Sequence, residues 1–74
     1  MNYDEIEKLI RKTADYVLRE CYIFFEDMSC AEKAFMDVYL CIYRSGLPYR
    51  KAIKKKSISS FIVAVCNQTT TTNN

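Results

Sequence analysis

Glycine and proline each occur once in the 74 residues, and they stand two positions apart, at Gly46 and Pro48. Glycine readily adopts the left-handed conformation that ends many helices, and proline fits the first turn of a helix, where its missing N–H is not needed. One helix should therefore end at Gly46 and another begin at Pro48. Because neither residue type occurs elsewhere, nothing prevents long helices on both sides of this point.

The first helix is expected from Tyr3 to Met28, where apolar residues recur at steps of three and four. Asn2 or Asp4 is suited to cap it, and the acids that follow complement the positive end of its dipole. A helix of this length is long for so small a domain. We therefore expect it either to break near Tyr22 or to project as an arm.

The second helix should begin at the sequence Ser29-Cys30-Ala31-Glu32, which has the form of a capping box. It should run to about Arg44 and stop at Gly46. Its apolar residues wrap almost all the way round, and a helix of this kind normally lies at the centre of a fold.

Downstream of Pro48 the chain divides into a basic segment and an apolar one. The residues from Pro48 to Lys56 are rich in Arg, Lys and Ala, which favours a helix of about two and a half turns. The hydroxyls of Ser57 and Ser59 are suited to cap a further helix from Ser59 to about Asn67. Several residues from Phe61 to Cys66 favour strands, so a short strand is an alternative there.

These patterns predict an all-α fold, a small bundle of about four helices with a long N-terminal helix and a C-terminal helix-turn-helix. A chain of 74 residues makes one domain. It should comprise residues 1–68, with 1–28 as the N-terminal helix and 29–68 as the helix-turn-helix core. The polar tail 69–74 has no apolar anchor and should be disordered.

Charge is distributed unevenly along the chain. Residues 1–43 contain nine acids and five bases, a net charge of −4, whereas residues 44–74 contain six bases and no acid, a net charge of +6. This asymmetry points to nucleic acid, or another acidic partner, at the basic half. The alternative is an ordinary solvated helix face.

The four cysteines, Cys21, Cys30, Cys41 and Cys66, are widely separated, and the chain has no histidine. Structural zinc sites normally use closely spaced ligand pairs, so we expect no metal or other cofactor and four buried thiols instead. The N-terminal sequence is unlike a secretory signal, and the longest uninterrupted apolar run, Phe61–Cys66, is too short to cross a bilayer. These features favour a reduced, cytoplasmic location without a membrane partner.

Catalysis has little support in the sequence. A cysteine nucleophile would need a base other than histidine, no glycine-rich phosphate loop is present, and most acids fall at solvent-facing helix positions. We therefore expect a protein that is not an enzyme.

A known family is similar to the C-terminal half. The segment from Tyr49 to Val63, YRKAIKKKSISSFIV, resembles without a gap the helix-turn-helix of bacterial sigma-factor region 4 and related regulators, whose pattern is roughly Y-x-x-I-A-x-x-L-G-I-S-x-x-T-V. Lys56 and Ser57 stand where that family carries leucine and glycine. The residues from Ser29 and the pair Gly46-Leu47 also resemble the family's preceding helix and its closing Gly-Leu, so that the similarity covers residues 29–68.

The resemblance implies a small DNA-binding transcription regulator, of phage, viral or plasmid type, that binds double-stranded DNA. The basic helix would contact phosphates, while Ser59 and Ser60, the polar groups of the following helix, would enter the groove. The serines also have a simpler role as helix caps. The candidate nucleic-acid-binding residues are Arg44, Tyr49, Arg50, Lys51, Lys54, Lys55, Lys56, Ser57, Ser59 and Ser60.

Two apolar surfaces suggest protein partners. The stripe of the first helix approximates a heptad repeat, so a homodimer through this helix and packing against the second helix are equally compatible with it. The apolar residues of the last helix suggest a different function, a small helical interaction module or antagonist that docks on a larger host protein. The stripe comprises Tyr3, Ile6, Ile10, Thr13, Val17 and Phe24, and the last helix offers Phe61, Ile62, Val63 and Val65.

Overall fold

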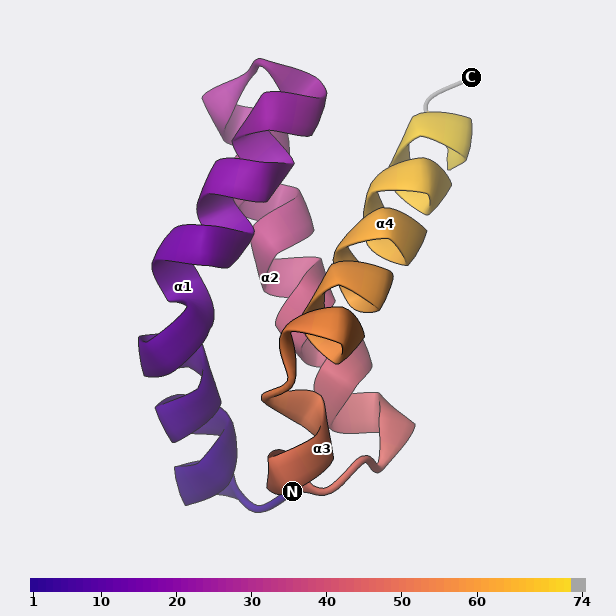
Figure 1. Ribbon diagram of the computed structural model, residues 1–74. Coiled ribbons are helices and arrows are strands. Elements are labelled where there is room, and N and C mark those ends of the chain that lie inside the picture. Colours follow the sequence, from indigo (N-terminus) through magenta and orange to yellow (C-terminus); the bar gives the residue numbers. More distant parts are fainter. Residues whose placement is uncertain (73–74) are drawn as a thin grey trace.

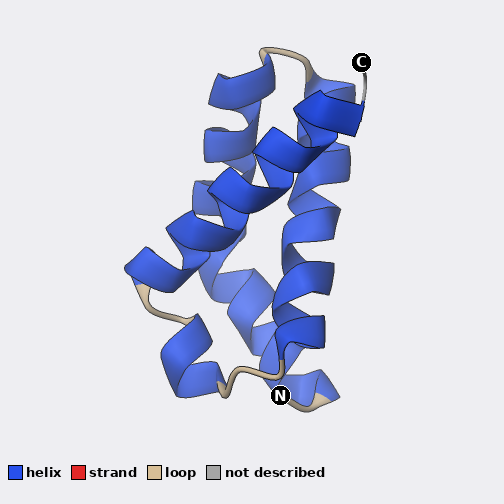
Figure 2. Cartoon of the chain, turned by 90° about the vertical axis from the view of Figure 1, so that its right-hand side faces the viewer, coloured by secondary structure: helices blue, strands red, loops and turns tan. Residues whose placement is uncertain are grey.

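Four helices make up most of the chain and confirm the expected all-α class (Figure 1). The computed structural model describes the backbone of residues 1–72 and the side chains of residues 1–68. Figure 2 shows helices joined by loops, with no strand anywhere in residues 1–72. The strand alternative for residues 61–66 is therefore wrong. None of the helices in this described part is both long enough and apolar enough to cross a membrane.

Helix α1 spans Tyr3–Phe25 and is capped by Asn2. The Asn2 side chain accepts a hydrogen bond from the Glu5 N–H at 2.8 Å, and the Glu5 carboxylate accepts one from the Asn2 N–H at 3.0 Å. The helix ends where Glu26 takes a left-handed conformation with φ 54°. It neither breaks near Tyr22 nor projects as an arm, because α2 folds back and packs along it (Figure 1).

Helix α2 spans Met28–Ser45, and Asp27 rather than Ser29 caps it. The left-handed Glu26 reverses the chain and leaves Asp27 extended, so that its carboxylate accepts a hydrogen bond from the Cys30 N–H at 3.0 Å. The predicted capping box at Ser29 is therefore wrong. The predicted C-cap is confirmed, since Gly46 is left-handed with φ 78°.

The basic segment after Pro48 is not one helix. Helix α3 covers only Tyr49–Ala52, and α4 spans Lys55–Thr72, with the break at Ile53 and Lys54. The predicted helix from Pro48 to Lys56 and the predicted start of the next at Ser59 are both wrong. Helix α4 also continues past the expected end of the ordered chain at residue 68, and residues 73–74 lie outside the described part.

A geometric conflict between two apolar stripes explains the break. At about 100° per residue, an unbroken helix would place Tyr49, Ala52 and Ile53 roughly 150° around the axis from Ile58 and its apolar neighbours. Only one of the two stripes would then face the core. The break lets Ala52 and Ile58 both become buried, with 0% and 1% of their surfaces exposed.

The core lies between α1, α2 and α4, and α3 closes one end of the bundle (Figure 1). Most of the α1 stripe packs inside the chain, as one of the two interpretations expected, with Val17 buried and Ile6 and Ile10 half-buried. Thr13 Oγ1 and Tyr39 Oη share a hydrogen bond of 2.7 Å between α1 and α2. The buried residues are Leu9, Val17, Cys21, Ala31, Ala34, Val38, Tyr39, Ile42, Ala52, Ile58, Ile62, Val65 and Cys66.

Replacement of Gly46 tests the chain reversal between α2 and α3. A Cβ at this position would have no neighbour within 4 Å, so the cost of Gly46→Ala is backbone strain alone. We expect the variant to lower the free energy of unfolding by about 1 kcal/mol. Gly46→Asn should cost roughly half as much, because asparagine tolerates the left-handed region. Urea denaturation measures both, and equal losses for alanine and asparagine would contradict this explanation.

Candidate nucleic-acid interface

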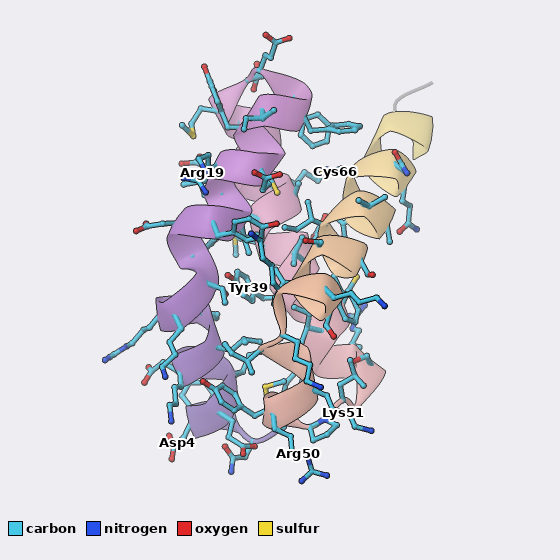
Figure 3. All side chains as sticks on the ribbon, in the orientation of Figure 1. Asp4, Arg19, Tyr39, Arg50, Lys51 and Cys66 are labelled. Carbon is cyan, nitrogen blue, oxygen red and sulfur yellow. The ribbon has the colours of Figure 1, made fainter. Side chains whose placement is uncertain are left out.

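The last six basic residues of the chain gather at one end of the bundle, here called the cationic end. Arg44 belongs to the last turn of α2, Arg50 and Lys51 to α3, Lys54 to the break, and Lys55 and Lys56 to the first turn of α4. All six residues are exposed. Arg50 and Lys51 mark this end in Figure 3.

No acid among the described residues forms an ion pair with a residue of the cationic end. The one ion pair among the described residues joins Arg11 and Glu7 at 3.8 Å, within α1. Asp4 lies toward the same end of the molecule, but on α1 (Figure 3). Glu5, beside it, is engaged in the α1 cap. The positive charge of residues 44–56 is therefore available to an external anion.

Two lysines are held over tyrosine rings beside this surface. The Lys8 Nζ atom lies 5.3 Å from the ring centroid of Tyr49, and the Lys55 Nζ atom lies 5.5 Å from that of Tyr16. Both distances fit cation–π contacts. Lys8 on α1 thus extends the cationic end, and the sequence analysis missed it. In the sequence, Lys8, Lys12 and Tyr16 are each one helical turn apart. This spacing is the signal that could have placed Lys8 on the same face of α1 as Tyr16.

Ser57, Ser59 and Ser60 do not occupy the predicted positions. All three lie inside α4, which begins at Lys55, so none of them starts a recognition helix. Ser59 is half-buried, and its Oγ shares a hydrogen bond of 2.9 Å with the Tyr16 hydroxyl. Ser57 is half-buried and Ser60 is exposed. Only Ser60 therefore presents its side chain to an external ligand as expected.

Tyr49 is a packing residue in this fold. It is half-buried against the core, and its hydroxyl is buried without a hydrogen-bond partner. With Lys8 over its ring, Tyr49 offers neither a free face for a base nor an accessible donor for a phosphate. The sequence had placed it among the binding residues because of the family pattern.

The outward face of α4 is poor in groups that read bases. After Lys55 and Lys56 in the first turn, its next exposed residues are Ser60, Val63 and Ala64, whereas bases are usually read by Arg, Lys, Asn or Gln. Asn67 and Gln68 are exposed farther along the helix, away from the cationic end. The geometry is suited to contacts with phosphates rather than with base edges.

A second surface carries exposed apolar side chains. Tyr3, Met36, Leu40 and Tyr43 line a groove of about 490 Å³ between the start of α1 and α2, and 70% of the Met36 surface is exposed. Lys33 and Asp37 stand at its rim. In contrast, the last helix turns most of its apolar residues inward: Ile62 and Val65 are buried, and Val63 is exposed.

The unsatisfied hydroxyl of Tyr49 yields a prediction. Tyr49→Phe removes a buried group without a partner, so we expect the free energy of unfolding to stay the same or to rise by up to about 1 kcal/mol. The matched control is Tyr39→Phe, which removes the bond to Thr13 and should lower it by about 1 kcal/mol. Chemical denaturation compares the two, and a larger loss for Tyr49→Phe would show that its hydroxyl has a partner.

No family model, curated protein or solved structure matches the chain. Within its described residues, no three Cys, Asp or Glu side chains are grouped in a way that could hold a metal ion. The assignment of a function therefore depends on the geometry and charge of the surfaces described above.

Proposed function

We propose that this chain is a small regulator that binds double-stranded DNA through the phosphate backbone, with the cationic end as its contact surface. The observation that carries the proposal is the exposure of six basic residues at one end without an acidic neighbour in an ion pair. Each lysine or arginine that neutralises a phosphate releases a condensed counterion, and this release drives binding.

The arrangement favours binding with little dependence on sequence. Ser59 is occupied by Tyr16, and the outward face of α4 presents small side chains near the lysines. Phosphate contacts position a protein on a duplex but do not distinguish bases. A role in transcription would then come from occupancy of DNA rather than from base readout by Ser59 and Ser60.

A duplex fits this surface better than a single strand does. Proteins that bind single strands stack bases on exposed aromatic rings. Tyr16 and Tyr49, which border the cationic end, are half-buried and lie under Lys55 and Lys8. The exposed Tyr3 and Tyr43 belong instead to the groove between α1 and α2. The rings of Tyr16 and Tyr49 therefore offer no stacking platform, whereas the lysines are suited to the regular phosphates of a double helix.

The test removes two positive charges from the cationic end. Lys54→Gln with Lys56→Gln should weaken binding to any duplex and reduce the slope of log K against log salt by about 2, since each lost phosphate contact contributes about 0.9. The measurement is fluorescence anisotropy with a labelled duplex across a salt series. The fold should be at least as stable as before, because a lysine at the start of a helix opposes its dipole.

The matched control removes the same charge elsewhere. Arg11→Gln with Arg19→Gln changes two exposed residues of α1, and Arg19 lies well away from the cationic end (Figure 3). This variant should keep nearly the full salt dependence. Equal losses of affinity in the two variants would show that only the net charge of the chain matters, which contradicts the proposed contact surface. Absence of binding to any duplex at low salt would overturn the proposal altogether.

A second candidate function is self-association through the groove of α2. Met36, Leu40 and Tyr43 form an exposed apolar line on this helix, and Lys33 and Asp37 flank it one turn apart. If two copies of α2 pack antiparallel about a two-fold axis near residue 35, Lys33 of each copy faces the partner's Asp37. This complementarity favours a second copy of the chain as the occupant.

Met36→Glu tests that candidate. The variant places a carboxylate in the apolar contact beside the two-fold axis, where it would lie close to the same carboxylate of the second copy. The variant should be monomeric where the unmodified chain is dimeric. Val63→Glu is the control, since Val63 is similarly exposed, at 59%, but lies on α4. Sedimentation equilibrium over a concentration series measures both, and a monomeric unmodified chain at every concentration would exclude this function.

A further inference from the structure

Two buried thiols from opposite ends of the chain meet in the core. Cys21 on α1 and Cys66 on α4 expose 0% and 1% of their surfaces, and their side chains share a hydrogen bond. None of the four cysteines forms a disulfide within the described residues. Cys30 and Cys41, both on α2, are half-buried. The fold thus pairs the two cysteines that lie farthest apart in the sequence.

A surface groove leads to one member of this pair. It measures about 200 Å³, runs between α1 and α4, and is lined in part by Phe24, Ile62 and Cys66. Cys21 is not among its lining residues. A small reagent that enters the groove therefore meets Cys66, whereas Cys21 does not line the groove.

The order of ionisation agrees with this order of access. Burial, followed by the nearby charge of Cys66 and the hydrogen bond that Cys21 donates to it, raises the pKa of Cys21 to about 12. Burial also raises the pKa of Cys66, but the same hydrogen bond, accepted by Cys66, partly offsets the increase. Cys66 is therefore the thiol that forms the nucleophilic thiolate first.

We propose that Cys21 and Cys66 form a reversible disulfide between α1 and α4 on reaction with a small-molecule disulfide such as oxidised glutathione. The Cys66 thiolate attacks one sulfur of the reagent, whose S–S bond breaks and releases one thiol. Cys21 then attacks the Cys66 sulfur of this mixed disulfide, and its proton passes to the departing thiolate, which leaves as the second thiol. Two protein thiols are oxidised by two electrons, and one disulfide is reduced to two thiols.

The disulfide would link α4 covalently to α1. Helix α4 begins at the cationic end with Lys55 and Lys56 and packs with Cys66 in the core, so the disulfide would restrain the helix that carries two of the candidate binding residues. Because the closed loop contains all of α2 and α3, its formation removes much of the freedom of the unfolded chain. The inference does not depend on DNA binding.

The test equilibrates the full-length chain in glutathione buffers of graded oxidation, followed by rapid alkylation and peptide mass spectrometry. We expect loss of two alkylatable thiols, a chain lighter by two hydrogen atoms, a linked peptide that contains Cys21 and Cys66, and alkylated Cys30 and Cys41. The oxidised chain should also melt at a higher temperature. Disulfides to Cys30 or Cys41, or four free thiols in the most oxidising buffer, would overturn the proposal.

Two variants separate the roles of the pair. Cys21→Ser should accumulate a stable glutathione adduct on Cys66, because the resolving thiol is missing. The double variant Cys30→Ser with Cys41→Ser should form the disulfide like the unmodified chain. The rate should rise with pH between 7 and 9, since the thiolate is the reacting form. A pH-independent rate, or modification of Cys21 before Cys66, contradicts the proposed order even if Cys21→Ser fails to fold.

Discussion

The structure depends on one constraint, that both apolar stripes of residues 49–66 must reach the same core. The stripe of Tyr49 and Ala52 and the stripe of Ile58 and Ile62 point in different directions on a single helix. The chain meets the constraint by interrupting the helix at Ile53 and Lys54. This break turns α4 back across α1 and α2 (Figure 1). It also leaves the lysines at an exposed corner, so the packing of the core determines where the positive charge of the chain is presented.

Features fixed by a single residue were readily predicted from the sequence. Gly46 ends α2 because the left-handed conformation is costly for other residues, and Pro48 precedes α3 because its ring fits a helix start. The all-α class followed from the periodicity of the apolar residues and the lack of other glycines and prolines. The start of α2 did not follow, because Asp27 and Ser29 are both good caps. The left-handed Glu26, which no local pattern announces, decided between them.

The candidate site was only partly predictable, because some of its features depend on contacts between distant residues. Exposure of the six basic residues follows from their composition, since lysine and arginine are rarely buried without a partner. The roles of Ser59 and Tyr49 depended instead on the register of α4, which is set by contacts between distant residues. Ser59 faces Tyr16 and Tyr49 lies under Lys8 only once α1 packs against α3 and α4. A family pattern that assumes another register assigns these side chains to the wrong surface.

The sign of the charge at its first turn distinguishes α4 from α1 and α2. The first turn of α1 contains Asp4 and Glu5, and Asp27 caps α2, as the positive end of a helix dipole favours. Helix α4 does the opposite, since its first turn contains Lys55 and Lys56 and no acid. Each lysine at the start of α4 destabilises the helix by about 0.3–1 kcal/mol when no ligand is bound. A bound anion would make the charge of the lysine favourable instead. Sites where a sequence departs from a rule that it obeys elsewhere are often functional. The ordinary starts of α1 and α2 therefore make the basic start of α4 an argument for an anionic partner at this end.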